Sequence, residues 1–373
     1  MRLRASRKFL KRILPALAAL LAIFLLAALV FAARCAAVPA PAKSVSAAAL
    51  DRRKITAGIP GYARAEVDTY LSYPEWYIVW SYQEKADFQE TRFPTRFPFF
   101  GSIQQYWSGY CCIYSFTRHR YALDIGEHAM LAVIGSSFSL EYAIKGAYET
   151  TVGRFTEWLS SHDTVDEDRY AYRVAREYAD FVHIRPFYEF SFWKKFKELW
   201  RETTWWGPHA VRKWERKAFL GLDYGMEALY CWLIEQATHA SYGYESADTY
   251  AWIENAPDGF FAANPRIRQV KQVGPQSFIV IIPRYQEFTA IASKLASQNV
   301  HFVEIAGNDE VLLTAIAPRG FVYDGPAQVL FSAGMLTRPD LQRIALRSPV
   351  ASLHEVLNHL ADRNVKLEHI YDF

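Results

Sequence analysis

Residues 278–316 read FIVIIPRYQEFTAIASKLASQNVHFVEIAGNDEVLLTAI, and this stretch decides the fold class of the C-terminal third. It opens with a short β-branched run and continues with a helical pattern whose apolar residues share one face. Two more apolar runs follow, joined across Gly307-Asn308-Asp309, which is typical of a hairpin turn. The pattern predicts strands at 278–282, 301–305 and 311–316 and a helix at 285–299.

The chain after this stretch extends the same pattern. A further strand is predicted at Gln328 to Ser332, a helix at Pro349 to Asn364 and a closing strand at Lys366 to Asp372. The resulting order, β-α-β-β-(β)-α-β, is that of a ferredoxin-like split βαβ unit. We therefore expect residues 256–373 to form a ferredoxin-like α+β domain.

The chain before this stretch has helical periodicity instead. Residues 63–255 are predicted to form an all-helical domain of about six helices, since 373 residues favour two folded units. Aromatic residues make up 16% of the chain, which suits either a membrane interface or an aromatic core. The last long helix follows Pro208 and has an apolar stripe at a period near 3.6: Val211, Trp214, Ala218, Leu222, Gly225, Leu229 and Leu233.

The N-terminus carries the pattern of a membrane anchor. Residues 13–33 contain no charged side chain, and 21 residues suffice to cross a bilayer as a helix. Residues 1–12 hold six cations, so the N-terminus is expected in the cytoplasm and the body outside it, in the periplasm if the organism is bacterial. A cleaved signal peptide is the alternative, because Ala-x-Ala-like sites occur between Ala33 and Ala42. Residues 34–62 are expected to be a flexible tether.

Composition and motifs narrow the possible functions. A net charge of +3 is too small to favour nucleic acid as a partner. The chain has no phosphate-binding loop, dinucleotide-binding glycine pattern, Gly-x-Ser-x-Gly elbow or Cys-x-x-Cys pair. No cofactor is therefore indicated, and four cysteines do not make a disulfide framework in a chain of this length.

Acids and histidines on the predicted helices are the candidates for catalysis. They are Glu127, His128, Glu141, Glu235 and His239. Helical bundles build metal sites from inward Glu and His, but these helices lack the usual Glu-x-x-His spacing. We therefore predict no metal site, and surface exposure of these side chains is the simpler alternative.

The segment Phe187 to Trp206 holds nine aromatic residues with interleaved cations. One interpretation is an interfacial helix in the headgroup layer of a membrane. The other is an amphipathic helix packed on its own domain. The candidate membrane-interface residues are Phe192, Trp193, Phe196, Trp200, Trp205 and Trp206. Arg185 and His209 flank the segment, where they suit either binding of an anionic ligand or capping of helix ends.

Two further apolar stretches resemble membrane spans but contain charges. Residues 128–148 include Glu141 and Lys145, and the helix after Pro208 includes Asp223 and Glu227. Charges near a bilayer centre are costly, so buried globular helices are expected at both places.

The sequence therefore predicts a single-pass membrane protein that binds a membrane lipid or another hydrophobic ligand, or protein partners in the envelope. The alternative is a membrane-associated enzyme with a Glu and His pocket that acts on an apolar substrate. A polytopic transporter is a more distant third.

Overall fold

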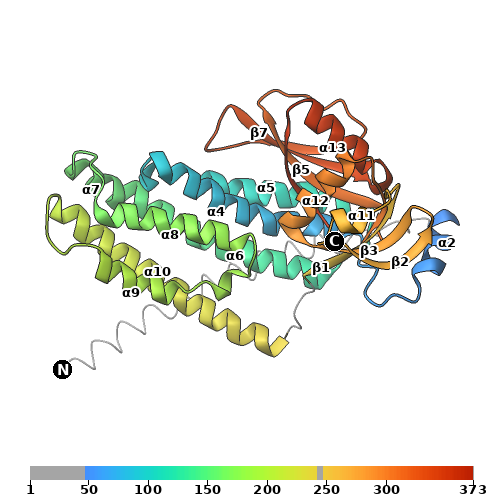
Figure 1. Ribbon diagram of the computed structural model, residues 1–373. Coiled ribbons are helices and arrows are strands. Elements are labelled where there is room, and N and C mark those ends of the chain that lie inside the picture. The colour runs from blue at the N-terminus through green and yellow to red at the C-terminus, as the bar shows by residue number, and fades with distance from the viewer. Residues whose placement is uncertain (1–46, 242–246, 373) are drawn as a thin grey trace.

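The computed structural model describes residues 47–241 and 247–372. Residues 47–241, here called the helical half, are helical, and the C-terminal third contains two antiparallel sheets, which confirms the α+β class (Figure 1). The helical half comprises α2 (Ala47–Thr56), α3 (Asp68–Leu71), α4 (Tyr73–Thr91), η1 (Pro94–Arg96), α5 (Phe99–Thr117), α6 (Ile125–Tyr148), the π-helix η2 (Glu149–Gly153), α7 (Arg154–Leu159), α8 (Asp166–Val182), η3 (Phe187–Glu189), α9 (Phe192–Glu202) and α10 (Ala210–Ser241).

Aromatic side chains fill the core between α4, α5 and α6. Tyr106 of α5 is fully buried and donates a hydrogen bond from its hydroxyl to the carbonyl oxygen of Leu131 on α6 (2.8 Å). Gly135 permits this close packing, because a Cβ atom there would lie 2.1 Å from the Tyr106 ring. The aromatic richness of the sequence therefore serves a helical core in this region.

The two sheets contain four strands each. Their strand orders are β2-β3-β1-β4 and β6-β7-β5-β8, and all neighbouring strands are antiparallel. The elements are β1 (Asp248–Glu254), α11 (Phe260–Ala263), β2 (Arg268–Gly274), β3 (Ser277–Pro283), α12 (Tyr285–Ser297), β4 (His301–Ile305), β5 (Glu310–Pro318), β6 (Gln328–Gly334), β7 (Leu341–Pro349), η4 (Val350–Ser352), α13 (Leu353–Asp362) and β8 (Lys366–Tyr371).

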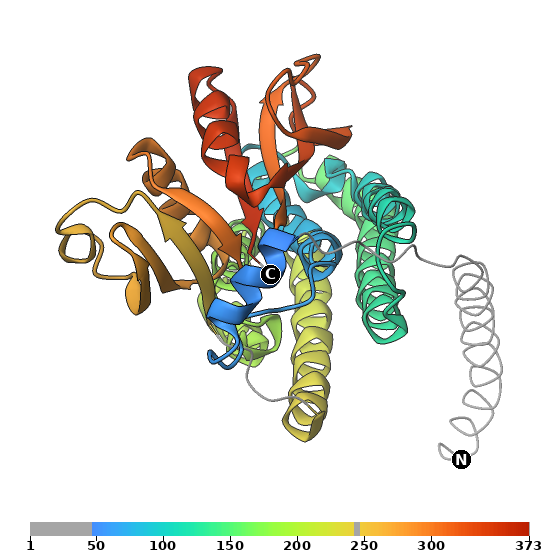
Figure 2. The ribbon, with the colours of Figure 1, turned by 90° about the vertical axis from the view of Figure 1, so that its right-hand side faces the viewer.

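The two sheets repeat one topology. The first unit runs β1-β2-β3-α12-β4 and the second runs β5-β6-β7-α13-β8, so adding four to each strand number converts one order into the other. Helices α12 and α13 pack against each other, and one hydrophobic core contains residues of both sheets (Figure 2). The repeat lies within the C-terminal third of the chain.

The structure replaces the ferredoxin-like arrangement of a single sheet with these two sheets. The expected hairpin between β4 and β5 is wrong, because the two strands belong to different sheets. Gly307 has a φ of 74°, and a Cβ atom there would lie 2.7 Å from the Cβ of Ala63. The backbone N–H of Arg64 also donates to the carbonyl oxygen of Ala306 (2.9 Å). The N-terminal segment thus packs against this turn, where the chain passes from one sheet to the other.

Part of the segment placed in the tether is folded onto the first sheet. In α2, Arg52 Nε lies 2.5 Å from Glu304 of β4, and the hydroxyl of Tyr62 donates to the same carboxylate (3.0 Å). Tyr62 packs with Trp252 and Ile279 of the sheet. Residues 47–62 therefore belong to the folded body.

The helical half and the second sheet share a core. Thr69 donates from Oγ1 to the carbonyl oxygen of Tyr371 (2.6 Å) and accepts from the N–H of Leu312 (3.0 Å). Arg343 of β7 is buried between Glu84 of α4 (3.0 Å) and Glu368 of β8 (2.6 Å). These ion pairs connect α4 to the second sheet. Removing one member would destabilise the fold, because it would leave a buried charge without a partner.

The predicted membrane anchor at residues 13–33 lies outside the described residues. Among the helices of the part of the chain that the structure describes, none is both long enough and apolar enough to cross a bilayer.

Candidate functional site

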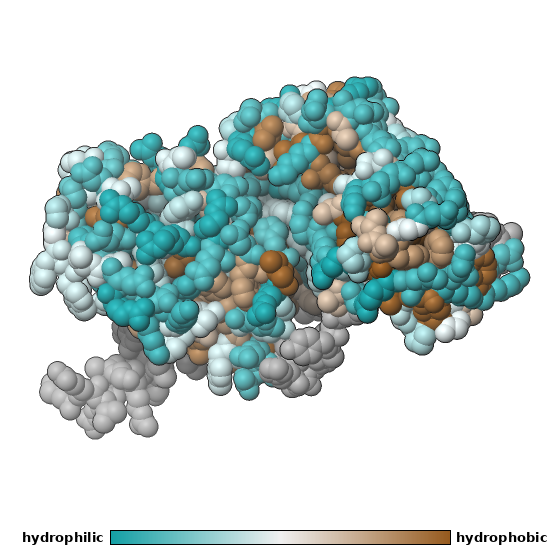
Figure 3. All heavy atoms as spheres, in the orientation of Figure 1, coloured by the Kyte–Doolittle hydropathy of each residue, from teal (hydrophilic) through white to brown (hydrophobic). Residues whose placement is uncertain are grey.

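An open groove of about 780 Å³ lies between α4, α6, α8 and α10. Its walls are mainly apolar and include Val79 of α4, Ile134 of α6, Met226 of α10 and Phe187 of η3. Figure 3 shows an apolar area on the surface near the C-terminal end of α8, where residues 182–187 contribute to one wall. Most small-molecule sites are pockets of about 300–1,000 Å³ with apolar walls, so this groove has the size and lining of a ligand site.

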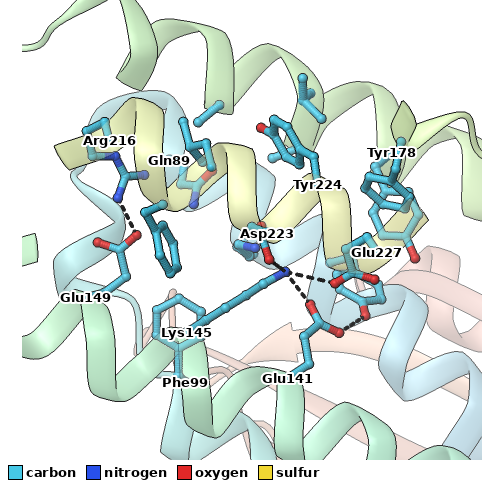
Figure 4. Close-up of a pocket in the computed structure, with 18 residues that line it drawn as sticks. Gln89, Phe99, Glu141, Lys145, Glu149, Tyr178, Arg216, Asp223, Tyr224 and Glu227 are labelled. Atoms are coloured by element: carbon cyan, nitrogen blue, oxygen red, sulfur yellow. Dashed lines mark hydrogen bonds and ion pairs between the residues drawn. The ribbon is translucent and has the colours of Figure 1, made fainter. Parts of the chain in front are cut away.

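A charged cluster forms the polar part of the groove. Lys145 of α6 lies 2.8 Å from Glu141 one turn earlier, 3.1 Å from Asp223 and 3.2 Å from Glu227 of α10 (Figure 4). The hydroxyl of Tyr82 donates to Glu141 (2.6 Å). The four charged side chains are only 11–19% exposed, and all of them line the groove. One ammonium group thus holds three carboxylates together across the interface between α6 and α10.

Burial and the charges around Lys145 set the protonation of this cluster. Burial raises the pKa of Glu227, the neighbouring Glu141 adds to the effect, and the pKa reaches about 7. Burial also opposes ionisation of Glu141, but Lys145 and Lys85 outweigh it, so the pKa of Glu141 is lowered. The carboxylates likewise outweigh burial at Lys145, whose pKa is raised well above its usual value. Near neutral pH, Glu227 is therefore the member that exchanges its proton.

A smaller cavity of about 60 Å³ lies beside this cluster. Lys85 lines it, and burial lowers the pKa of its ammonium group. Glu149 at the start of the π-helix η2 pairs with the buried Arg216 (2.7 Å), and its other carboxylate oxygen, Oε2, has no hydrogen-bond partner. Gly153 leaves room for this oxygen, because a Cβ atom there would lie 2.6 Å from it. A cavity of this size that contains several charged side chains is large enough for ordered water.

Of the five candidate catalytic residues, Glu141 lines the groove. Glu127 and His128 lie near the start of α6, and at 1.5 Å per residue Glu127 is about 21 Å from Glu141 along the helix. The imidazole Nδ1 of His128 lies 2.9 Å from the hydroxyl of Tyr110, and burial lowers the pKa of this histidine. Glu235 is on α10 two turns beyond Glu227, and the side chain of His239 lies outside the described residues.

The two candidate ligand-binding residues are far apart in the fold. Arg185 lines the groove and lies 3.8 Å from Glu189. His209 precedes α10 at the other end of that helix, where its Nε2 is 3.1 Å from Asp163. Arg185 therefore belongs to the groove, whereas His209 faces an acid next to α8.

The candidate membrane-interface residues divide between the inside and the surface of the protein. Phe192 is buried and packs with Tyr224, while Phe196 and Trp200 of α9 are partly buried against the same core. Trp193, Trp205 and Trp206 are exposed. The apolar face of α9 thus packs on α8 and α10 within the helical half.

Sequence reasoning missed Lys145, Asp223 and Glu227 as site residues. The available signal was that each of two apolar helices carries a pair of charges four residues apart, Glu141 with Lys145 and Asp223 with Glu227. Residues four apart share a helix face, so the two pairs can meet between two packed helices.

Within the part of the chain that the structure describes, no group of three His, Cys, Asp or Glu side chains is arranged to hold a metal ion. Comparisons with protein-family models, with curated proteins and with solved structures found no match for this chain.

Proposed function

We propose that this chain is a membrane-anchored extracytoplasmic protein that binds a lipid or a similar elongated apolar ligand. The observation that carries the proposal is the groove of about 780 Å³ with mainly apolar walls and a charged cluster around Lys145. A lipid has the same division into a long apolar part and a small polar part. Burial of the apolar part contributes about 25 cal/mol per Å² of surface removed from water.

The polar groups of the groove suit a headgroup with both donors and acceptors. The cluster around Lys145 offers carboxylate oxygens and an ammonium group, and Arg185 offers a guanidinium at the margin. Charge-assisted hydrogen bonds of this kind fix orientation more than they add affinity.

Binding is favoured over catalysis by the state of the charged groups. The three carboxylates share one ammonium group, and Glu141 is the one candidate catalytic side chain seen in the groove among those described. A general acid or base must reach the reacting atom of a substrate, whereas these groups are directed at one another.

The anchor is supported by the sequence alone. Residues 13–33 lack charge and follow six cations, a bias that keeps the N-terminus in the cytoplasm. The first element that the structure describes is α2, and residues 34–46 lie between it and the predicted anchor.

Native mass spectrometry of the full-length chain, extracted from the expressing membrane in mild detergent, tests this function. We expect the wild-type chain to carry a lipid-sized mass. Ser137 lines the groove, so Ser137→Trp should obstruct it and lower the occupancy at least tenfold. Val322→Trp is the matched control, because Val322 is 80% exposed and lies in the loop between β5 and β6. Wild-type protein that carries no ligand, or only a bound protein, would contradict the proposal, as would unchanged occupancy in Ser137→Trp.

A further inference from the structure

Helix α10 exposes its apolar residues and buries its basic ones, which is the reverse of an ordinary surface helix. Arg212, Lys213, Arg216 and Lys217 are buried, although they are the most polar residues of the helix. The exposed residues between positions 211 and 233 are all apolar: Val211, Ala218, Leu222, Met226, Leu229, Trp232 and Leu233. The charges of α10 thus point into the protein and its apolar stripe points out.

Helix α6, on the other side of the groove, also exposes apolar residues. Between positions 125 and 147 its exposed residues are Ile125, Gly126, Ala129, Val133, Leu140, Ile144 and Ala147, again without a charge. Leu140 and Ile144 of α6 and Leu222 and Met226 of α10 line the same groove and are 58–66% exposed. The two apolar stripes therefore border one opening and share one face of the helical half.

Helix α8 provides the contrast within the same bundle. Its exposed residues are Arg169, Arg173, Glu177 and Asp180, all charged. An ordinary water-facing helix has this pattern. Exposed apolar surface is concentrated on α6 and α10, and contiguous patches of this kind mark a contact with a partner or a membrane.

We propose that the face formed by α6 and α10 lies against the hydrocarbon of a lipid bilayer and that the groove opens toward it. The proposal rests on the membrane anchoring proposed above. Val211 and Leu233 are 22 residues apart, or about 33 Å along the helix, so the apolar stripe covers most of α10. An apolar helix face of this kind lies in the plane of the membrane surface, about 5–10 Å deep.

Aromatic residues at both ends of the stripe favour a bilayer over a protein partner. Trp206, 76% exposed, precedes α10, and Trp158 lies at the end of α7. Trp232 is near the other end of the stripe. Exposed tryptophans gather at the boundary between hydrocarbon and water, where a helix that lies along the membrane surface would place them.

The length of the connecting segment keeps this face within reach of the bilayer. Residues 34–46 number thirteen, and an extended chain spans at most about 3.5 Å per residue, or roughly 45 Å. The charges that argue against a bilayer, in particular Lys145, Asp223 and Glu227, are only 11–19% exposed and pair with one another. Figure 2 shows α6 and α10 extending together beyond the sheets on the lower side of the view.

Depth-dependent fluorescence quenching tests this docking. The full-length chain, with Cys35, Cys111 and Cys112 replaced by Ser, is reconstituted into phosphatidylcholine–phosphatidylglycerol vesicles. A fluorophore is attached at Leu229→Cys or at the smaller change Ala218→Cys, and at Val322→Cys as the matched exposed control. We expect nitroxides on the acyl chains to quench the α10 labels at least fivefold more than the control. Iodide in the water should quench mainly the control label.

Equal quenching by iodide at the α10 labels and the control would overturn the proposal. Disulfide crosslinks between two copies at Leu229→Cys would also overturn it, because a second chain would then cover the face. If the labels report water while the wild-type protein still carries a lipid-sized mass, docking fails and the proposed ligand function stands.

Discussion

Replacing Glu227 by Gln should stabilise the protein, although it removes a member of an ion-pair cluster. The pKa of Glu227 is about 7, against an ordinary value of 4.5, because burial and Glu141 oppose its charge. A difference of 2.5 corresponds to about 3 kcal/mol at 1.36 kcal/mol per pKa unit. This is the cost of ionising Glu227 in the folded protein relative to the unfolded chain.

Proton linkage determines how the contribution of Glu227 to folding stability changes with pH. Between pH 4.5 and 7 the folded protein keeps a proton that the unfolded chain has released, so the contribution of Glu227 to stability falls as pH rises through this window. Glutamine resembles the protonated form at every pH. Glu227→Gln should therefore raise the free energy of unfolding by up to about 3 kcal/mol at pH 8 and change it little below pH 4.5.

Glu141→Gln is the matched control, with the same chemical change in the same cluster. The pKa of Glu141 is lowered because Lys145 and Lys85 outweigh burial, so its charge stabilises the folded protein. That contribution is present above the ordinary pKa and is lost as pH falls through the folded pKa. Glu141→Gln should therefore destabilise the protein at pH 8.

Urea unfolding of the full-length chain in mild detergent, followed by tryptophan fluorescence from pH 4 to 8.5, measures both effects. Shifts of the two variants in the same direction at pH 8 would refute the assignment of the exchangeable proton to Glu227. So would a pH-independent effect of Glu227→Gln.

Three more changes test the packing described above by the same unfolding measurement. Arg343→Met should lower the free energy of unfolding by about 3–5 kcal/mol, because it leaves Glu368 buried without its cation. A change below 1 kcal/mol would show that this ion pair does not stabilise the contact between α4 and the second sheet. Gly135→Ala should cost about 1–3 kcal/mol, because its methyl group meets the Tyr106 ring. Gly225→Ala on α10 meets nothing within 4 Å and should gain about 0.5–1 kcal/mol, so similar effects of the two alanines would refute the packing argument.

Periodicity in the sequence located most helices and five strands but not the arrangement of the sheets. Strand β7 was missed because Arg343 and Arg347 interrupt its apolar pattern, although both pair with acids in the fold. Strand β2 is an exposed edge strand without apolar alternation. The division into two sheets depends on contacts between distant segments, such as Ala63 with Gly307, which a local pattern does not contain.

The charged cluster around Lys145 also depends on contacts between distant segments. A period of 3.6 identified the two faces of the last long helix but does not say which face points inward. Charges inside the apolar helices counted against membrane contact, because an isolated charge in hydrocarbon is costly. The structure brings Lys145 of one helix to Asp223 and Glu227 of another, 78 and 82 residues later in the chain. Neither segment alone indicates this contact.

The contacts between α2 and the first sheet determine how the protein responds to a pull on its N-terminal segment. Any pull that arrives along the chain before Ala47 acts first on α2, where Arg52 pairs with Glu304 of β4 and with Asp309 in the turn between β4 and β5. These contacts are loaded in parallel with the packing of Tyr62, so tension is shared over the sheet. The helical half, which contains the groove, lies outside this load path. A pull on the residues before Ala47 can therefore move the body as one piece without stretching the helices that form the groove.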